Sequence, residues 1–184
     1  MSDELWQQLT SEAQQVIQQE PLLASYVYAC VLNHNSLASA LSFILANKLS
    51  DDVMPVVTVR ELFDDAFASS PEIIEHAACD IKAVYERDAA ICSYLPVILY
   101  LKGFQSIQVH RLAHFLWIND RKQLALFIQS RNSEVFSVDI HPACVIGRGI
   151  MLDHATGIVI GETSVIEDNV SILQQVTLGG TGNE

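Results

Sequence analysis

The sequence of 184 residues predicts an α+β protein, with an all-α N-terminal region followed by a short parallel β-helix. Over most of the first 132 residues, apolar side chains recur at three- and four-residue spacing, the period of amphipathic helices. From about residue 138, aliphatic residues recur every six positions, which suits neither a helix nor one long strand. The boundary is therefore expected between residues 131 and 138, and the predicted domains are 1–137 and 138–184.

Several expected helices begin at a recognisable residue. Ser36 can cap a helix by accepting a hydrogen bond from the first turn. Pro55 and Pro71 are expected in the first turn of the next two helices, where a missing N–H is tolerated. Pro96 starts another helix with Gly103 inside its pattern. The expected helical ranges are 3–19, 21–33, 37–49, 55–68, 71–87, a helix from 96, 104–120 and 121–132, with a connector at 88–93.

The six-residue repeat forms two runs that share one register except for an eight-residue step between Leu152 and Ile160. In a parallel β-helix each hexad forms one flat face, and three faces close a coil of about eighteen residues. The aliphatic residue fills the interior, and a following glycine permits a tight corner. An ordinary strand pair with accidental spacing is the weaker alternative. The aliphatic positions are Ile140, Ile146, Leu152, Ile160, Ile166, Ile172 and Leu178, and the glycines are Gly147, Gly161 and Gly179.

Charge excludes several classes of partner. Ten Lys and Arg residues stand against 22 Asp and Glu, a net charge of −12. This charge opposes binding to nucleic acid or to an anionic membrane surface. No apolar run is long enough to span a membrane, and the acidic, polar start is unlike a secretory signal peptide. We therefore expect a soluble, cytoplasmic protein with no nucleic-acid or membrane partner.

Four cysteines lie far apart and form no CxxC pair, so they are interpreted as reduced thiols, most of them buried. Zinc ligation is the weaker alternative because paired ligand spacing is missing. The cysteines are Cys30, Cys79, Cys92 and Cys144.

Longer runs of sequence carry a family resemblance. In the hexad region they are DIHPACVIGRGIMLDHATGIVIGET and VSILQQVTLGGTG, and upstream they are LASALSFILANKL, AACDIKAVYERD and LKGFQSIQVHRLAHFLW. Together they resemble serine O-acetyltransferase, the hexapeptide-repeat family of cysteine biosynthesis. The resemblance implies that the β-helix is left-handed. It also implies transfer of an acetyl group from acetyl-CoA to the hydroxyl of L-serine, giving O-acetylserine and CoA.

The same resemblance implies partners. Acetyl-CoA is a co-substrate rather than a permanently bound cofactor, and L-cysteine is a feedback inhibitor. Trimers form through the β-helix and pair through the helical domain into hexamers. In the family a C-terminal tail docks into O-acetylserine sulfhydrylase. Because the chain stops at Glu184, before that tail and before a second histidine and further coils, we expect a truncated member with a ragged end at Asn183–Glu184.

His154 is the first candidate catalytic residue. It lies beside the eight-residue step, where a departure from the strict repeat can turn a side chain out of the stack towards a cleft. By resemblance it is the general base that takes the proton from the serine hydroxyl as that oxygen attacks the thioester. Imidazole suits this role because it exchanges protons near neutral pH. The alternative is a surface histidine at a coil corner.

Three carboxylates complete the expected site. Asp139 lies fifteen residues before His154, so it can approach the imidazole from the preceding coil. By resemblance it is the dyad's acid, which fixes the tautomer and stabilises the imidazolium; a cap between helix and coil is the alternative. The resemblance also implies that Asp88 and Asp153 hold the ammonium group of serine or cysteine. For Asp88 the alternative is a solvated loop acid.

The remaining candidates point to structure rather than chemistry. His141 opens the coil and is interpreted as structural. His110 and His114 have metal-ligand spacing, but no third ligand stands in a matching position, so a packing role is preferred and no metal site is expected. The GGTG run at 179–182 lacks the ending and setting of a P-loop. By resemblance, most acetyl-CoA-binding residues belong to coils that would follow Glu184, so none is assigned within the chain.

Two other classes of function stay open. One is a hexapeptide acyltransferase that acts on a sugar or another amine, which would keep the histidine without preferring serine. The other is a non-catalytic oligomerisation core that assembles without turnover.

Overall fold

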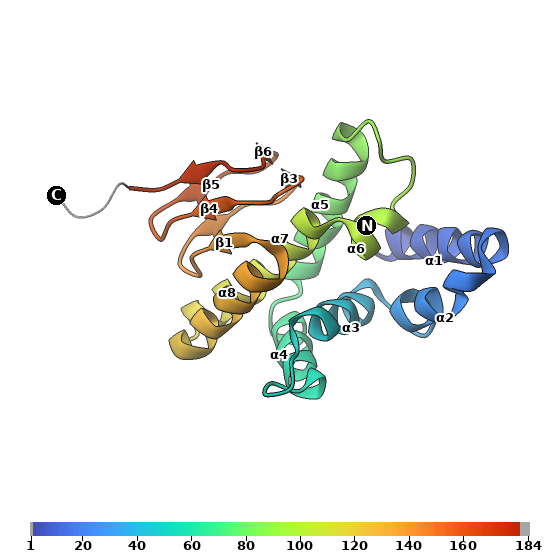
Figure 1. Ribbon diagram of the computed structural model, residues 1–184, viewed down its shortest axis with the longest axis horizontal. Helices are drawn as coiled ribbons and strands as arrows, with labels where there is room; N and C mark the ends of the chain where they lie inside the picture. The colour runs from blue at the N-terminus through green and yellow to red at the C-terminus, as the bar shows by residue number, and fades with distance from the viewer. Residues whose placement is uncertain (1, 181–184) are drawn as a thin grey trace. The chain divides into compact units, whose positions relative to one another are not determined.

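The computed structural model describes residues 2–180, and it confirms the predicted order of a helical region followed by a parallel β-helix (Figure 1). The expected ragged end at Asn183–Glu184 lies outside the described residues. The chain divides into two compact units, Met1–Leu101 and Lys102–Glu184. Each unit is described by itself.

The first unit is helical. Its longer helices bury apolar stripes against one another, and α3, with apolar residues almost all round, is the most buried of them. The elements are α1 (Ser2–Gln19), η1 (Pro21–Leu23), α2 (Ala24–Val27), η2 (Tyr28–Leu32), α3 (Leu37–Leu49), α4 (Val56–Ser69), α5 (Glu72–Arg87) and α6 (Leu95–Tyr100).

The helix expected over 21–33 is instead three successive helical types. It opens as a 3₁₀ turn, in which the N–H of Leu23 donates to the carbonyl of Glu20 at 3.0 Å. It closes as a π-helix, in which the N–H of Asn33 donates to the carbonyl of Tyr28 at 2.9 Å. Apolar spacing predicts a helix but does not specify the hydrogen-bond offset, so the sequence could not distinguish these types.

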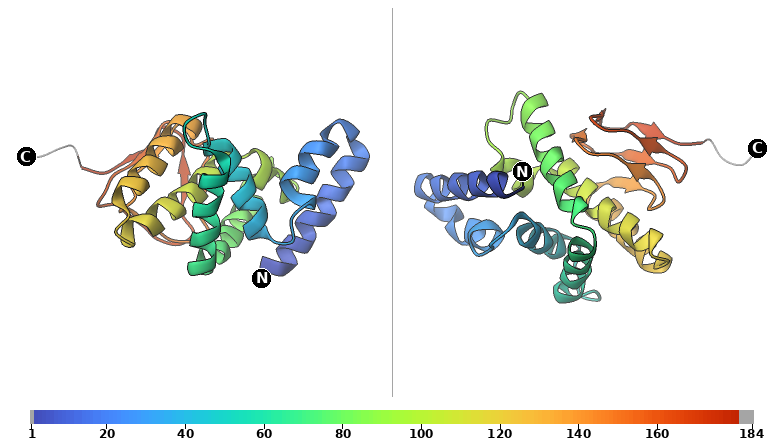
Figure 2. Two further views of the ribbon diagram at one scale, coloured as in Figure 1. Left: turned by 90° about the horizontal axis from the view of Figure 1, so that it is seen from below. Right: turned by 180° about the vertical axis from the view of Figure 1, so that it is seen from behind.

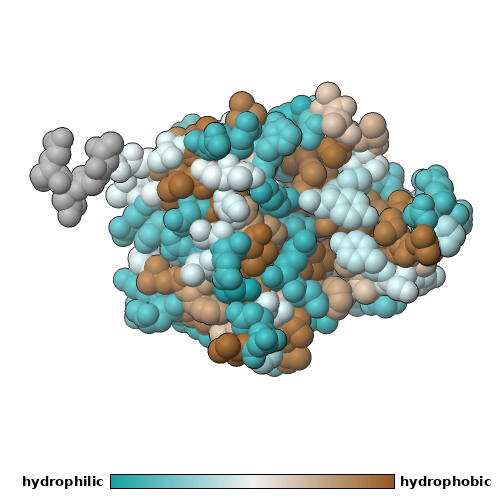
Figure 3. Space-filling view, viewed as in Figure 1, coloured by the Kyte–Doolittle hydropathy of each residue, from teal (hydrophilic) through white to brown (hydrophobic). Residues whose placement is uncertain are grey.

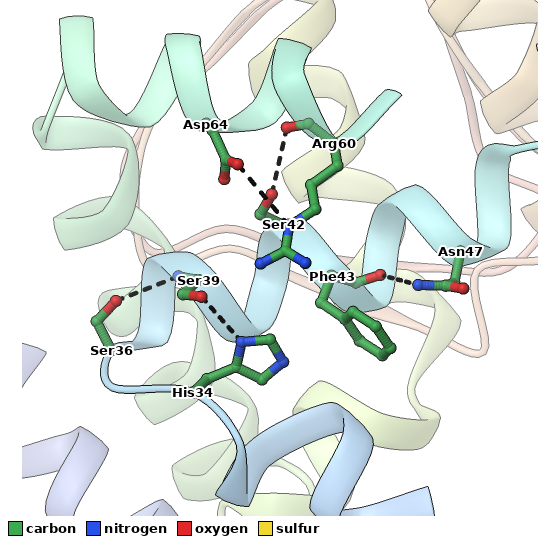
Figure 4. A network of polar contacts seen from close by, with 8 residues as sticks. All are labelled: His34, Ser36, Ser39, Ser42, Phe43, Asn47, Arg60 and Asp64. Atoms are coloured by element: carbon green, nitrogen blue, oxygen red, sulfur yellow. Dashed lines mark hydrogen bonds and ion pairs between the residues drawn. The ribbon is translucent and has the colours of Figure 1, made fainter. Parts of the chain in front are cut away.

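A polar network surrounds the start of α3 (Figure 4). The hydroxyl of Ser36 accepts the N–H of Ser39 at 3.2 Å, which confirms Ser36 as the N-cap. His34 contacts the carbonyl of Ala29 through Nε2 at 2.9 Å and the hydroxyl of Ser39 through Nδ1 at 2.8 Å. Because a carbonyl only accepts, Nε2 carries a hydrogen, and the histidine fastens the preceding π-helix to α3.

The same network joins α3 to α4. The hydroxyl of Ser42 donates to the carbonyl of Arg60 at 3.4 Å, and the Arg60 guanidinium lies over the Phe43 ring, 5.8 Å from its centroid. The guanidinium also forms a long, exposed ion pair with Asp64, 3.8 Å. Such exposed contacts each contribute little, so the packing of apolar side chains beneath them holds the pair of helices together.

Two expectations on helix starts are corrected. Pro55 and Pro71 are the N-cap residues of α4 and α5, one position before the first turn. The helix expected from Pro96 through Gly103 breaks at Leu101, which has an extended ψ of 103°, so Gly103 belongs to the next helix.

The second unit combines a pair of helices with the coil (Figures 1 and 2). Helix α7 (Lys102–Ile118) packs along α8 (Lys122–Phe136), and both contact the first strands. The compact division therefore falls at Leu101, whereas the predicted domains divide where helix gives way to strand, between α8 and β1. The division at 137 into an oligomerisation domain and an acyltransferase domain stays a prediction. The strands are β1 (Val138–Ile140), β2 (Val145–Ile146), β3 (Met151–Asp153), β4 (Ile158–Ile160), β5 (Val165–Ile166), β6 (Ser171–Leu173) and β7 (Thr177–Leu178).

Strand pairing is parallel and three-sided. The sheets are β1-β4-β7, β2-β5 and β3-β6, so each face of the coil is one sheet. Val138 pairs with Ile158, twenty positions later, whereas Val159 pairs with Thr177, eighteen positions later. The first turn is thus two residues longer than the second, and the eight-residue step in the sequence accounts for the difference.

The aliphatic positions fill the coil as predicted. Five of them are buried, namely Ile140, Leu152, Ile160, Ile166 and Ile172, and Ile146 and Leu178 are half-buried. Helix α7 closes against this stack at Gly103, where an added Cβ would lie 2.0 Å from the carbonyl oxygen of Leu152. Only glycine permits so close an approach between the helix and β3.

Apart from Gly179, which has a φ of 149°, the residues with positive φ in the coil are not the glycines expected at its corners. Ser137, Gly157 and Gln175 have φ of 59°, 76° and 62° and occupy the same corner in successive turns. Gly149 and Asn169, at 69° and 61°, do the same at another corner. The coil therefore turns through left-handed residues stacked on one another.

Gly147 and Gly161, predicted to permit tight corners, do not have left-handed backbones. Space is the reason for Gly147, because its Cβ would lie 2.4 Å from Oδ1 of Asp168. Gly161 stacks on Gly179, with a Cβ position 3.3 Å from the Cα of that residue.

Within residues 2–180, no single helix is long and apolar enough to cross a membrane. The segments Pro21–Leu32 and Leu37–Leu49 reach that length and composition only as a pair, bent by 119°.

Candidate functional site

The corner between β3 and β4 carries His154 and holds the two extra residues of the first turn. His154 and Ala155 have φ of 56° and 63°. The N–H of Ala155 donates to the carbonyl of Asp153 at 2.6 Å, and the N–H of Thr156 to that of His154 at 2.8 Å, so two γ-turns follow one another. Left-handed non-glycine residues cost about 1–3 kcal/mol each, so the surrounding structure must hold this corner in place.

The corner directs its two extra side chains in opposite directions. Ala155 is fully buried and plugs the coil, whereas the side chain of His154 is 75% exposed. Nε2 of His154 lies 3.8 Å from Oδ1 of Asp153, whose side chain is 31% exposed. This distance is too long for a hydrogen bond but close enough for electrostatic attraction once the imidazole is protonated. A proton acceptor and an anion thus stand side by side at an accessible corner.

Asp139 lies in the middle of β1, where its Oδ1 accepts a hydrogen bond from Nε2 of Gln129 at 2.8 Å. In strand register it pairs with Val159, and across residues 2–180 no hydrogen bond joins it to His154. The expected dyad therefore stays a prediction. The alternative of a cap is wrong, because the residue that ends α8 is Ser137.

A cleft of about 550 Å³ opens beside Asp139, between the end of α8 and β1. Its half-buried carboxylate is therefore reachable by a solute. Gln129 could not be identified from the sequence, because it lies on a helix and its partner on a strand, with no motif linking them. The lining residues are Leu126, Gln129, Ser130, Ser133, Glu134 and Asp139.

Asp88 lies in the first unit, where it is the C-cap of α5. Its Oδ1 accepts the N–H of Ala90 at 2.9 Å, a local turn that occupies one carboxylate oxygen. The alternative of a freely solvated acid is thus too simple. A site that combines Asp88 with His154 stays a prediction.

The other histidines of the second unit have structural surroundings. His110 is buried, and burial, with smaller contributions from His114 and Arg111, lowers its pKa to about 3. Nδ1 of His114 donates to the carbonyl of Pro142 at 2.8 Å. Nδ1 of His141 accepts the N–H of Ala143, 3.1 Å. In the described part of the chain, no group of three or more His, Cys, Asp or Glu side chains is arranged to hold a metal ion.

All four cysteines are free thiols, but only Cys30 and Cys144 are buried, fewer than expected, whereas Cys79 is half-buried and Cys92 is exposed. Burial raises the pKa of the Cys144 thiol to about 11. At neutral pH this residue is a protonated, enclosed thiol and not a nucleophile.

The first unit has a cleft of its own, about 570 Å³, beside the network at the start of α3. None of the predicted site residues lines it. The lining residues are Ala29, Leu32, Asn33, His34, Asn35, Ser39, Phe43 and Arg60.

Comparison with known proteins gives consistent matches. The family model described as "Serine acetyltransferase, N-terminal" matches residues 5–109. A serine acetyltransferase of Haemophilus influenzae is 53% identical over 184 residues, covering 100% of this chain and 69% of its own length. One from Escherichia coli K12 is 55% identical over 178 residues, covering 97% and 65%. The chain thus spans about two thirds of the length of these relatives.

Solved structures extend the match to the fold. A serine acetyltransferase in complex with CoA has a TM-score of 0.97 and 53% identity, covering 98% of this chain and 78% of its own. One in complex with cysteine has a TM-score of 0.98 and 53% identity, covering 100% and 76%. A soybean serine acetyltransferase complexed with serine has a TM-score of 0.96 and 49% identity, covering 100% and 75%.

Proposed function

Because the chain belongs to the serine acetyltransferase family, we propose that it transfers the acetyl group of acetyl-CoA to the hydroxyl of L-serine, with O-acetylserine and CoA as products. The observation that carries this proposal is the corner at Asp153 and His154. Serine bears an ammonium and a hydroxyl on neighbouring carbons. The corner offers a carboxylate and an imidazole 3.8 Å apart, one for each group.

The reaction follows from these two groups. Nε2 of His154 accepts the proton of the serine hydroxyl while the oxygen attacks the thioester carbonyl. The tetrahedral intermediate collapses, the C–S bond breaks, and the CoA sulfur leaves and takes the proton from the imidazolium. Asp153 lies beside Nε2 and stabilises the imidazolium in between. Direct transfer is preferred to a covalent intermediate, because Cys144, a cysteine of the coil itself, is an enclosed thiol.

The remaining assignments are part of the same proposal. Asp139 acts as the dyad acid that orients His154, and Asp88 joins Asp153 in holding the substrate ammonium. L-cysteine, which shares the ammonium and carboxylate of serine, competes for this position as an inhibitor. The relatives solved with CoA, cysteine and serine support this set of ligands. Acetyl-CoA is a co-substrate, with no permanently bound cofactor.

Exposed apolar residues support a homo-oligomer, either a trimer or a dimer of trimers. Val145 and Val165 are 50% and 70% exposed and lie in register on one outer face of the coil. Figure 3 shows apolar residues reaching the surface among hydrophilic ones on the face it presents. A cytoplasmic location fits cysteine biosynthesis and the four free thiols. Docking of O-acetylserine sulfhydrylase through a C-terminal tail, which the family resemblance implies, stays a prediction.

The test measures release of the CoA thiol from acetyl-CoA with L-serine, for this chain beside His154→Ala. Turnover that disappears in the variant is expected, and His76→Ala, at a half-buried histidine of α5, serves as the control that keeps it. Equal rates with serine, other amines and sugars would favour a hexapeptide acyltransferase with another acceptor. A defined oligomer in light scattering with turnover no greater than that of His154→Ala would instead identify a non-catalytic core.

A further inference from the structure

The corner that carries His154 is held by three hydrogen bonds of one residue, Thr156. Its carbonyl accepts the N–H of Gln175 from the next turn of the coil at 2.9 Å. Its own N–H donates to the carbonyl of His154 and closes the second γ-turn. Its hydroxyl accepts a hydrogen bond from the ammonium of Lys102. The first two contacts are made by the backbone, and only the third depends on side chains.

Lys102 is well placed to act as a fixed support. It is the first residue of α7, directly before Gly103, and Gly103 packs so closely on Leu152 that an added Cβ would clash with the Leu152 carbonyl oxygen. The start of α7 therefore cannot move away from the end of β3 without opening that contact. A lysine anchored at this point connects a rigid helix to the strained corner.

We propose that Lys102 and Thr156 form a clamp that positions the imidazole of His154. This inference depends on the proposed function, because it takes His154 to be the general base. Two left-handed residues in succession have no intrinsic preference for this conformation, so the corner keeps it only while its flanks are held. When the clamp is removed, the backbone of His154 samples other conformations and the base spends less time in its productive orientation.

The proposal makes Lys102 and Thr156 positioning residues, which predicts a particular kinetic pattern. Neither side chain bonds the reacting atoms, so Thr156→Val, which keeps the shape and loses the hydroxyl, should lower kcat by about three- to tenfold, the range that one exposed hydrogen bond supports, with little change in the KM for L-serine. Thr156→Ser, which keeps the hydroxyl, should restore most of the activity. Lys102→Met should reproduce the effect of Thr156→Val, and the double variant should be no worse than either single variant.

A second measurement does not depend on activity. Amide hydrogen exchange at Ala155 and Thr156 reports whether the two γ-turns stay closed. Exchange should accelerate in Thr156→Val and Lys102→Met, and stay at the wild-type rate in Thr156→Ser. Thr163→Val is the matched control, an exposed threonine at a coil corner of equal length in both turns, and it should change neither exchange nor kcat.

The results of these two measurements distinguish a failure of the proposed clamp from a failure of the proposed function. Wild-type kcat and wild-type exchange in Thr156→Val would overturn the clamp, and so would additive losses in the double variant. If the wild-type chain shows no turnover, the proposed function fails and the catalytic half of the clamp fails with it. The exchange rates alone then decide whether Lys102 and Thr156 hold the corner.

Discussion

The two turns of the coil have nearly the same backbone structure, and they differ in length at one corner. In the second turn the corresponding corner consists of Gln174 and Gln175, with one left-handed residue, because Val176 stands in register with Ile158. In the first turn β3 passes into β4 through His154–Gly157, with three left-handed residues and two γ-turns. The rest of the register is shared. The short corner satisfies the repeat, and the long one departs from it to expose an imidazole.

The difference shows how a repetitive scaffold accommodates a special residue. Stacked strands on either side fix both ends of the long corner, so the two extra residues are accommodated within it, with Ala155 buried and the side chain of His154 exposed. The conformational cost is confined to His154 and Ala155, and the strands above and below keep their pairing. Strain that is stored locally in this way is typical of functional sites.

The largest expected effect comes from making the two turns equal. Deleting His154 and Ala155 gives the first turn the length of the second. We expect serine acetylation to fall to the level of His154→Ala, while Tm stays the same or rises, because two strained residues are removed. CoA release and thermal denaturation measure the two effects.

The control for this deletion removes Glu162 and Thr163, from a corner that has the same length in both turns. It should lower Tm, because the stacking of that corner on residues 141–144 is lost. A Tm that falls equally in both deletions would contradict the idea that the long corner is an addition to a regular coil.

A second effect contrasts the exposed imidazole of the corner with the buried one of α7. The pKa of His110 is about 3 in the folded protein, against 6.5 as its ordinary value. The unfolded chain therefore binds a proton that the folded one excludes, and stability should fall as pH drops from about 6.5 towards 3. The slope is up to about 1.4 kcal/mol per pH unit. Urea denaturation across this range should show a shallower slope in His110→Leu, and an unchanged slope would count against a buried neutral imidazole.

A smaller effect tests the helix that supports the long corner. Gly103→Ala places a Cβ 2.0 Å from the Leu152 carbonyl oxygen, so α7 and β3 must separate. We expect a loss of about 1–3 kcal/mol in the free energy of unfolding, measured in urea. Gly180→Ala, where nothing lies within 4 Å of the added Cβ, is the matched control and should be neutral.

The smallest effect concerns the carboxylate on the outer face of β1. Removing the amide that donates to Asp139, in Gln129→Ala, should lower kcat by about tenfold, since a hydrogen bond to a charged group contributes about 1.5 kcal/mol. Ser133→Ala, on the same helix and lining the same cleft, should not lower it. Equal rates in the two variants would show that Gln129 does not position Asp139.

The coil could be predicted well from the sequence, because the residues that repeat every six positions are those that fill the interior of the coil. Ile140, Leu152 and Ile160 recur at the spacing of the faces, and the step after Leu152 marks the long corner. The hand of the coil and the roles of the site residues came from the family resemblance. The prediction of left-handed residues at Gly147 and Gly161 was wrong. A neighbouring residue lies too close for a side chain at these positions, and the backbone does not need a positive φ there.

Contacts between residues far apart in sequence could not be predicted. Lys102 and Thr156 are 54 positions apart and belong to a helix and a coil corner, and no periodicity relates them. Likewise, the helical spacing of α7 and α8 does not indicate that they pack against the strands that follow. Because they do, the compact units divide at Leu101 and not at 137. The spacing of the repeat indicated the long corner, but not the contact between Lys102 and Thr156 that supports it.

Ser137 both ends α8 and begins the stacked corner that leads into β1. Helix hairpins form from contacts close in sequence, whereas each later strand must find a partner eighteen or twenty positions back. Closing such loops costs entropy before any contact compensates for it. We therefore expect the α7–α8 hairpin to form first, with the strands added to it one after another. In the structure β1 contacts α8, β4 pairs with β1 and β7 pairs with β4, so the order of the contacts follows the order of the chain and suits folding during synthesis.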